Sequence, residues 1–319
     1  MLLSIVIPTY NRCQFLKENL QTLLPQVKKY KDLVDITIFD NDSNDYTKDI
    51  VESTCKRNNT LVRYVKHDKN IGATANIDAA AFSSKSKYTF IMGDDDVIAP
   101  HFMDVIIPLL QSPTEYGIIF WNRLSGNTEL KNNKLFDSSY HSSIEEYSTP
   151  DFIKTHLDEP NFLSSLLFYT ECWQIGASLV DKNLDGYRWY GQILLGALQL
   201  VRKCLYYYFP LVIQQNPSKP WARLWPHYGI VEMNRLFHIF DTYIPGIETI
   251  WLKKNSSLVD VALKSIVLDQ KYYRQEKKEL MAHFSRLQKI KGIIFLYTPM
   301  PRITIKIVDK LETILRFIF

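Results

Sequence analysis

The hydrophobic pattern of the first 121 residues alternates between strand-like and helix-like segments. Short apolar runs bounded by polar turns predict five strands, at residues 3–7, 36–39, 61–65, 88–92 and 117–121. Amphipathic or alanine-rich stretches predict helices between them, at residues 14–24, 46–55, 73–82 and 100–110. Repeated β–α units are typical of a mostly parallel sheet with helices on both faces, so we expect an α/β fold.

Polar clusters follow four of the predicted strands. They are Pro8–Arg12, Asp40–Asp45, Asn70–Asn76 and Asp94–Asp96. In a parallel sheet, ligands bind beyond the carboxyl ends of the strands, where the strand order reverses. Each cluster also has a simpler explanation, because turns favour Asn, Asp, Ser and Pro, and residues 43–45 are candidates for capping the next helix. The coincidence of four clusters at one sheet edge favours a binding site there.

Three consecutive carboxylates, Asp94, Asp95 and Asp96, follow the fourth predicted strand. Carboxylates this close repel one another unless a cation or hydrogen-bond donors compensate. Mg²⁺ and Mn²⁺ prefer oxygen ligands and often keep bound phosphates as partners. The run is therefore either a metal site at a strand end or a solvated acidic turn.

The second half is aromatic, and its pattern predicts a mainly helical region with helices at residues 160–169, 190–208, 227–240 and 258–287. Residues 123–148 are polar, which indicates an excursion over the site or a flexible connector. We therefore divide the chain into a core (1–122), an acceptor-side region (123–255) and a basic helical C-terminal region (256–319).

Composition describes a globular protein, with 46% hydrophobic and 13% aromatic residues in 319. Its four scattered cysteines form no CxxC pair, which fits a reducing compartment. The N-terminus is a poor signal peptide, and no apolar run reaches the ~18 residues that a membrane span needs. We expect a cytoplasmic protein. The sequence does not determine the oligomeric state, and a homo-oligomer is one of the possibilities.

The formal charge of +4 is concentrated in the tail, where residues 271–319 hold eleven Lys or Arg against four Asp or Glu. A general nucleic-acid binder is therefore not expected. Residues 303–318 place apolar side chains on one helical stripe and basic ones on the other. This segment either docks on protein or binds the anionic face of a membrane.

Four motifs in order, Ser4–Arg12, Asp40–Ser43, Asn70–Gly72 with Asn76, and Gly93–Asp96, resemble family-2 glycosyltransferases with the GT-A fold. The resemblance is strong over residues 1–121 and loose beyond. Within the family, the opening and the Gly-Asp-Asp-Asp form are similar to abequosyltransferases of O-antigen assembly. That implies a CDP-activated dideoxyhexose donor, a polyprenyl-diphosphate-linked oligosaccharide acceptor, and a peripheral location on the inner face of the bacterial inner membrane.

The resemblance also implies roles for individual residues. Thr9 and Tyr10 line the base pocket, Asp40 binds base or ribose, and Asp94 contacts ribose or a metal-bound water. Asp96 binds the Mn²⁺ or Mg²⁺ that bridges the diphosphate. The full set expected to contact the nucleotide sugar is Pro8, Thr9, Tyr10, Arg12, Asp40, Asn70, Gly72, Asn76, Asp94, Lys219 and Arg223.

Arg12 and His227 each have two possible roles, and Lys219 and Arg223 are further candidates for the diphosphate. Arg12 is either an exposed first-turn residue or a second clamp on the diphosphate. Lys219 and Arg223 lie where relatives often have a mobile loop and could grip the diphosphate. His227 either completes the metal site or is simply a helix N-terminal residue after Pro226.

The chain lacks the Glu-Asp pair that many relatives carry in the second half. Asp185, Glu171 and Asp95 are candidates for the base that deprotonates the acceptor hydroxyl, and each is equally explained as a surface or capping carboxylate. If none serves, leaving-group-assisted attack with retention becomes the alternative route. A catalytically degenerate protein that binds a nucleotide sugar, or acts as a membrane assembly partner, is the alternative function.

Other enzyme classes fit the motifs poorly. A polymerase needs a second metal-binding Asp motif and a larger chain. A nicotinamide-dependent oxidoreductase needs GxGxxG after the first strand, where this chain has no glycine. A nucleotidyltransferase needs a Gly-rich basic loop at the same place.

Overall fold

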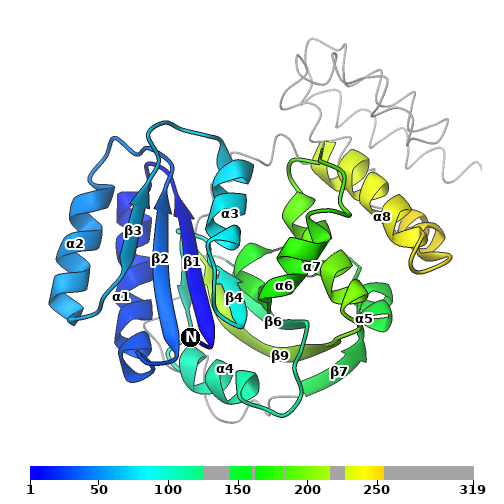
Figure 1. Cartoon of the computed structure of the whole chain (residues 1–319), viewed down its shortest axis with the longest axis horizontal. Coiled ribbons are helices and arrows are strands. Elements are labelled where there is room, and N and C mark those ends of the chain that lie inside the picture. The colour runs from blue at the N-terminus through cyan, green and yellow to red at the C-terminus, as the bar shows by residue number, and fades with distance from the viewer. Residues whose placement is uncertain (126–143, 158, 160–161, 183, 216–226, 255–319) are drawn as a thin grey trace, which may run out of the picture. The chain divides into compact units, whose positions relative to one another are not determined.

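The computed structural model describes the chain except for residues 126–143, 158, 160–161, 183, 216–226 and 255–319. It divides into two compact units (Figure 1): residues 1–181 with 188–217, and residues 182–187 with 218–319. The C-terminal basic segment, Lys219 and Arg223 lie outside the described residues. No helix in the described part of the chain is long and apolar enough to cross a membrane.

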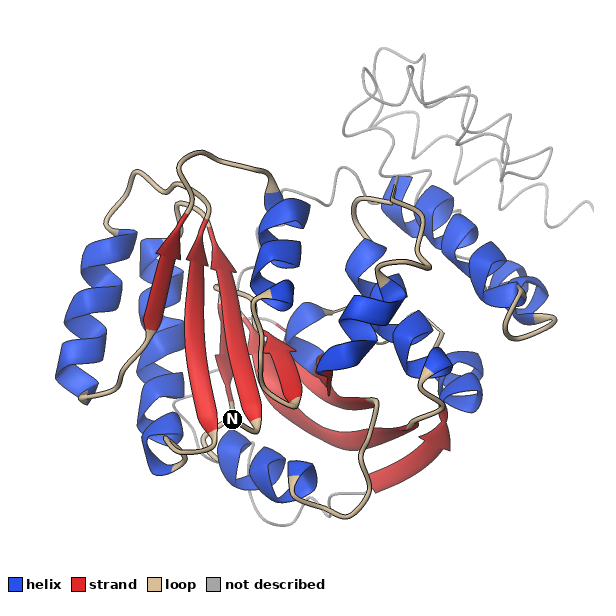
Figure 2. Cartoon of the chain, in the orientation of Figure 1, coloured by secondary structure: helices blue, strands red, loops and turns tan. Residues whose placement is uncertain are grey.

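The first unit is built on a sheet whose described strands run in the order β3-β2-β1-β4-β8-β6-β9-β5, with β7 beside β9 (Figure 2). The strands are β1 (Leu3–Thr9), β2 (Val34–Asp40), β3 (Arg63–Lys66), β4 (Tyr88–Ile91), β5 (Asp96–Ile98), β6 (Ile118–Ser125), β7 (Ile144–Ser148), β8 (Leu166–Tyr169) and β9 (Lys203–Gln214). The helices are α1 (Cys13–Lys29), α2 (Thr47–Asn58), α3 (Ala73–Phe82), α4 (Phe102–Leu110), α5 (Thr149–His156), α6 (Thr170–Gly176) and α7 (Arg188–Gln199), with a short 3₁₀ helix, η2 (Leu163–Ser165).

Strands β3, β2, β1 and β4 are parallel, and the sheet becomes mixed from β8 onward. Both β2 and β3 lie on one side of β1, whereas β4 lies on the other. The strand order therefore reverses between β1 and β4, and the carboxyl ends of these two strands form the switch point at which ligands bind in such sheets. The mostly parallel sheet with its helices confirms the expected fold class.

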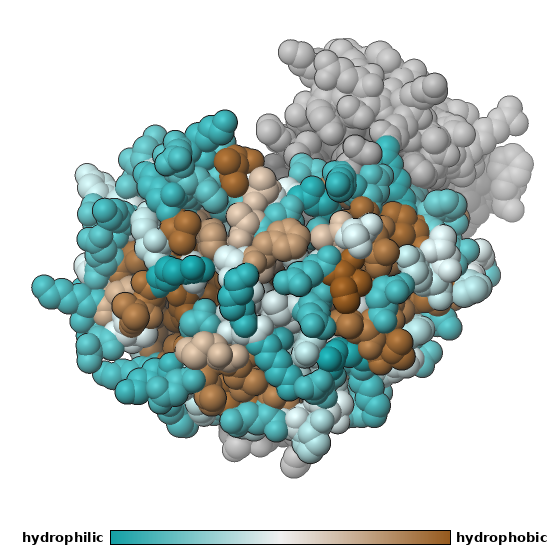
Figure 3. Space-filling view, in the orientation of Figure 1, coloured by the Kyte–Doolittle hydropathy of each residue, from teal (hydrophilic) through white to brown (hydrophobic). Residues whose placement is uncertain are grey.

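Helices α1, α2 and α4 pack together on one face of the sheet, and α3, α6 and α7 on the other. For α1, α2 and α3 this division follows from the right-handed crossovers between parallel strands, because the chain moves outward from β1 to β3 and then returns to β4. Helix α1 buries an apolar stripe against the sheet: Leu16, Leu20, Leu23, Leu24 and Val27. On the face displayed in Figure 3, hydrophilic residues surround smaller hydrophobic patches.

The expected elements of the first 121 residues are confirmed, with shifted ends and with the short strand β5 in addition. Two helix predictions in the second half are wrong. Residues 163–169 form η2 and β8, and the helix predicted over 190–208 ends at Gln199, after which β9 begins. A short apolar run does not distinguish strand from helix, and the aromatic stretch Tyr206–Phe209 favours a strand.

In the second unit, a π-helix (His227–Glu232) continues into α8 (Met233–Asp241). This confirms the helix predicted over residues 227–240. The core of the unit is aromatic: the Trp251 ring stacks on Phe237 at 4.5 Å, and its indole N–H donates to Asn234 Oδ1 at 2.6 Å.

Candidate active site

The aspartate cluster occupies the turn between β4 and β5, at the switch point. Thr9, the last residue of β1, donates its hydroxyl to Asp94 Oδ2 at 2.7 Å. One guanidinium nitrogen of Arg12 binds both Asp94 Oδ1, at 3.1 Å, and Asp95 Oδ2, at 3.0 Å. The loop after the first strand therefore holds the aspartates directly, as the clustering at one sheet edge led us to expect.

Arg12 is not the exposed first-turn residue that was one of its two interpretations. Its side chain is 34% exposed and bridges two carboxylates. The charge of the arginine offsets part of the repulsion between Asp94 and Asp95. A solvated acidic turn is also excluded, because Asp94 and Asp96 are only 5% and 3% exposed.

Asp96 is held differently. Its Oδ2 accepts the hydroxyl of Ser164 at 2.5 Å, and the same hydroxyl oxygen accepts the Gly93 N–H at 2.7 Å. The other oxygen, Oδ1, is buried and has no hydrogen-bond partner among the described residues. Gly93 is required by this close approach, since a Cβ there would lie 2.6 Å from Asp96 Oδ2.

A buried amide fixes the turn from the other side. Asn19, in the middle of α1, donates its Nδ2 to the carbonyl oxygens of Gly93 and Asp96, both at 2.9 Å. The sequence analysis missed both Asn19 and Ser164. The one available signal was a polar residue on the apolar stripe of α1, because Asn19 is fully buried between Leu16 and Leu20.

Burial and mutual repulsion disfavour the ionised carboxylates. Burial, reinforced by the charge of Asp95, raises the pKa of Asp94 to about 6 in spite of the opposing effect of Arg12. Burial and the charge of Asp95 also raise the pKa of Asp96 well above its usual range, and the Ser164 hydrogen bond offsets only part of this. Carboxylates kept in a site that disfavours their charge are a feature of functional sites.

The loop after β2 lies beside the β1 loop. Asp40 is 1% exposed, and its carboxylate accepts the Ser43 N–H at 2.8 Å and the Tyr64 hydroxyl. Burial and the hydrogen bond to Asp40 raise the pKa of Tyr64. The Ser43 hydroxyl in turn accepts the Asn11 N–H at 2.9 Å, which joins the β2 loop to the β1 loop.

The third loop is tied to the second by amide side chains. Asn41 donates to Asn70 Oδ1 at 3.0 Å, and the same oxygen accepts the Gly72 N–H at 2.8 Å. Gly72 precedes α3 with φ +87°, a backbone conformation that favours glycine. Asn76 is buried and donates to the Phe39 carbonyl at 3.0 Å, while its Oδ1 contacts His67 Nε2.

The structure thus brings most of the predicted donor-side residues to one sheet edge. Pro8 lies within β1 and pairs with Phe39 of β2, and Tyr10 is 43% exposed at the end of β1. Asn70 and Asn76 serve as internal braces of this edge. Whether any of these residues contacts a ligand stays a prediction.

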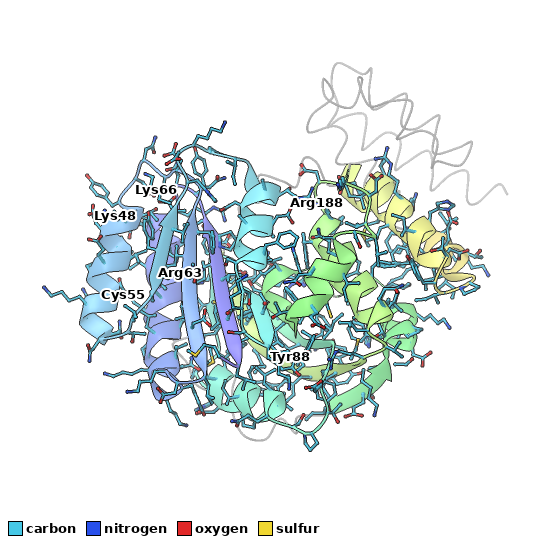
Figure 4. The ribbon with its side chains drawn as sticks, in the orientation of Figure 1. Lys48, Cys55, Arg63, Lys66, Tyr88 and Arg188 are labelled. Atoms are coloured by element: carbon cyan, nitrogen blue, oxygen red, sulfur yellow. The ribbon has the colours of Figure 1, made fainter. Side chains whose placement is uncertain are left out.

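Glu171 does not reach this site. Tyr169 pairs in the antiparallel β8–β4 ladder with Tyr88, which is labelled in Figure 4. Glu171, two residues after Tyr169, therefore lies near the amino end of β4. The aspartates follow the carboxyl end of β4, and the four-residue strand alone spans roughly 13 Å. A general base must come within hydrogen-bond distance of the hydroxyl, so this geometry contradicts the assignment of Glu171.

Asp185 belongs to the second unit, where a buried carboxylate organises its loop. Glu232 is fully buried and accepts the backbone N–H groups of Asp185, Gly186 and Tyr187 at 2.9, 2.8 and 3.0 Å. The Asp185 side chain itself is exposed. The sequence analysis missed Glu232, and no sequence signal marked it.

The described residues contain no group of three or more His, Cys, Asp or Glu side chains arranged around one point for a metal. His227 begins the π-helix, but its side chain is not among those described. The cluster nevertheless fits Mg²⁺ or Mn²⁺, because Asp96 presents a buried oxygen to which no described residue is hydrogen-bonded, and such ions often use one or two carboxylates plus substrate phosphates.

Comparison with known families identifies the class of protein. The model of glycosyl transferase family 2 matches residues 4–163, which includes every motif of the first sheet edge. The chain belongs to this family.

Part of the chain is similar in sequence to two curated glycosyltransferases. The chain is 31% identical over 115 residues to abequosyltransferase RfbV of Salmonella typhimurium, covering 36% of this chain and 34% of that protein. It is 25% identical over 155 residues to the GalNAc(5)-diNAcBac-PP-undecaprenol beta-1,3-glucosyltransferase of Campylobacter jejuni, covering 47% of each. The matches thus span between a third and a half of the lengths of these relatives.

Solved structures share the fold over most of the chain. Staphylococcus aureus TarS 1–349 has a TM-score of 0.52 at 14% identity, covering 92% of this chain and 89% of that one. Mannosyltransferase PcManGT of Pyrobaculum calidifontis, solved with GDP-Man and Mn²⁺, has a TM-score of 0.52 at 12% identity, covering 93% and 88%. These similarities confirm the GT-A fold.

Proposed function

We propose that the protein transfers a sugar from a nucleotide diphosphate donor to a hydroxyl group of a glycan acceptor. The observation that carries this proposal is the buried oxygen of Asp96 that has no partner in the described part of the chain, at the switch point of the sheet and beside Asp94 and Arg12. A buried carboxylate in this state is unfavourable on its own. A bound cation, together with an anionic ligand, would compensate this buried charge.

Asp96 would hold Mn²⁺ or Mg²⁺, and the neighbouring Asp94 would assist it. The bound ion would supply positive charge to the diphosphate as the leaving group becomes more negative. Arg12 bridges Asp94 and Asp95 and is still 34% exposed, so its guanidinium is placed to donate a further hydrogen bond to a diphosphate oxygen. Lys219, Arg223 and His227 stay predictions for the same end of the donor.

The three loops that follow β1, β2 and β3 in the chain would hold the nucleoside. Asp40 is pinned by Ser43 and Tyr64, so its carboxylate keeps one orientation toward a base or ribose donor group. Tyr10 is the exposed aromatic residue of the first loop and offers a ring for stacking. The mutual bracing of these loops supports a preformed pocket wall.

The base for an inverting transfer is proposed to be Asp95 or Asp185. Asp95 is 21% exposed at the cluster itself, where it is paired with Arg12. Asp185 is exposed on a loop that Glu232 holds rigidly. If neither acts, attack assisted by the leaving group with retention is the remaining route.

We propose CDP-abequose or a related CDP-sugar as donor and a polyprenyl-diphosphate-linked O-antigen oligosaccharide as acceptor. The names of the two curated relatives, an abequosyltransferase and an undecaprenol-diphosphate glucosyltransferase, support this choice. The solved neighbours carry UDP-GlcNAc or GDP-Man, which supports a nucleotide sugar in general. Such an acceptor would place the protein peripherally on the cytoplasmic face of the inner membrane.

A thermal-shift screen tests the proposal. The protein is heated with CDP, UDP, GDP or dTDP, each with and without Mn²⁺, and Asp96→Asn serves as the control. We expect the largest stabilisation with CDP and Mn²⁺, and its loss in the variant. No stabilisation by any nucleotide would contradict a donor site, and a preference for UDP would contradict the cytidine assignment alone.

A degenerate family member that binds but does not transfer is the second candidate. It is favoured by one observation, that Glu171 lies away from the cluster and so leaves fewer candidates for the base. Slow hydrolysis of the donor sugar distinguishes the two functions, since it needs no acceptor. Tight binding of the CDP-sugar with neither hydrolysis nor transfer would establish the degenerate function.

A further inference from the structure

Ser164 stands out because it contacts the aspartate cluster from a distant part of the chain. It lies in η2, which directly precedes β8, and is 68 residues from Asp96 in the sequence. It is fully buried, and its carbonyl accepts the indole N–H of the equally buried Trp121 at 3.1 Å. The position of Ser164 is therefore fixed by the core of the sheet.

The hydrogen bonds of Ser164 have only one consistent direction. A serine hydroxyl has one proton to donate and lone pairs that accept. The Gly93 N–H can only donate, so Ser164 Oγ accepts it at 2.7 Å. The hydroxyl proton is then free for Asp96 Oδ2, 2.5 Å away, and Oδ2 must accept it.

This arrangement makes the two oxygens of Asp96 inequivalent. Oδ2 is committed to the serine, whereas Oδ1 is buried without a partner among the described residues. Turning the carboxylate out of its plane would break the Ser164 bond. Asn19 separately holds the backbone of Asp96 through its carbonyl oxygen. Only one oxygen is thus left for a ligand, and it is held in one direction.

We propose that Ser164 is a positioning residue that aims Asp96 Oδ1 at the divalent cation of the donor site. This inference rests on the proposed function, because it takes Asp96 as the cation ligand. Ser164 touches neither donor nor acceptor in it. Partners of this kind orient metal-binding side chains, and their loss typically lowers metal affinity or activity by about 10–100-fold.

The chain supplies a matched control in the next residue. Ser165 lies in the same 3₁₀ helix, is equally buried, and its hydroxyl has no partner among the described residues. Ser164→Ala and Ser165→Ala therefore each remove one hydroxyl oxygen from a buried position of the same short helix. Among the described residues, only Ser164→Ala removes hydrogen bonds, namely those with Asp96 and Gly93.

The test measures Mn²⁺ affinity by electron paramagnetic resonance of the free ion, on the full chain with CDP present. We expect about 10–100-fold weaker binding for Ser164→Ala and a change of less than about threefold for Ser165→Ala. The pair Ser164→Thr and Ser164→Val, equal in shape, separates the hydroxyl from packing and serves if the alanine variant fails to fold. Thr is expected to bind Mn²⁺ better than Val by a similar factor.

Activity supplies a second, independent readout. A positioning role raises the Mn²⁺ concentration needed for half-maximal turnover, and saturating Mn²⁺ restores most of kcat; a merely structural role would lower thermal stability without changing this concentration. Two results would overturn the inference and leave the proposed function intact, provided that the wild-type protein binds Mn²⁺. One is unchanged Mn²⁺ binding in Ser164→Ala, and the other is equal Mn²⁺ binding in the Thr and Val variants. Absence of Mn²⁺ binding by the wild-type protein would overturn the proposed function itself, and the inference with it.

Discussion

Asp96→Asn should stabilise the metal-free protein and at the same time remove transfer. The substitution keeps the shape of the side chain and removes a charge that the fold disfavours. Burial and the charge of Asp95 raise the pKa of Asp96, so folding opposes its ionisation. This disadvantage is absent below the ordinary carboxyl pKa, grows as pH rises toward the raised value, and is constant above it. The variant should therefore gain most at alkaline pH.

The magnitude follows from the neighbouring carboxylate. The pKa of Asp94 is raised from 3.8 to about 6, which corresponds to about 3 kcal/mol at about 1.4 kcal/mol for each tenfold change in proton affinity. The pKa of Asp96 is raised in the same direction, by burial and by the charge of Asp95, so its variant is relieved of a cost of the same kind. The new amide group faces the place where Oδ1 has no partner among the described residues, which costs about 1–3 kcal/mol. The variant should gain stability overall, and each 1 kcal/mol of gain raises Tm by roughly 2–4 °C.

The assay is thermal unfolding at pH 8 with a chelator, paired with donor turnover at saturating Mn²⁺. Transfer should fall about a hundredfold or more, the loss expected for an electrostatic stabiliser of the leaving group. Asp104→Asn is the control, because hydrogen bonds from Lys29 and Tyr30 lower the pKa of Asp104 and its variant should lose a little stability. A less stable Asp96→Asn protein with near-normal turnover would refute the reasoning.

Three further predictions concern other parts of the structure. Gly93→Ala puts a methyl group 2.6 Å from a carboxylate oxygen of the cluster, so turnover should fall at least tenfold, and normal kinetics would show that the turn tolerates displacement. Glu232→Gln weakens charge-assisted bonds to three backbone N–H groups and should destabilise the second unit by about 1.5–3 kcal/mol; unchanged protection of amides 185–187 in hydrogen exchange would contradict this. Hydrogen bonds from Lys87 and Arg202 lower the pKa of Glu115 to about 2, so its stabilising effect is present above pH 4.5 and is lost as pH falls toward 2. Glu115→Gln should therefore show a shallower loss of Tm over that range, and a curve parallel to wild type would argue against the ion pairs.

The parallel half of the fold was predictable because its signals are local. Strands β1, β2 and β4 are short, mostly apolar runs that end in polar turns, and α1 carries apolar residues at helical spacing. In the second half, reliance on local signals led to two wrong helix predictions. β8 is only four residues of Leu and aromatic side chains, and whether such a run becomes a strand depends on β4 and β6 beside it.

The candidate site was predictable to the extent that its residues follow strands in sequence. Asp94 and Asp96 were identified from their position after β4, and Arg12 from its position after β1. Asn19 and Ser164 were missed because they reach the cluster through tertiary packing, over 74 and 71 residues from Gly93. The two interpretations of Arg12 stayed open in the sequence because its two partners lie 82 and 83 residues away along the chain.

The central claim is that Asp96 presents one oxygen to a cation that accompanies the donor diphosphate. The most direct measurement is an anomalous-difference map from a crystal of the protein soaked with Mn²⁺ and CDP. We predict a manganese peak in coordination distance of Asp96 Oδ1, shared with the diphosphate, while Oδ2 keeps its bond to Ser164. Manganese and nucleotide bound elsewhere, with the Asp94–Asp96 turn unchanged and without a ligand, would contradict the account.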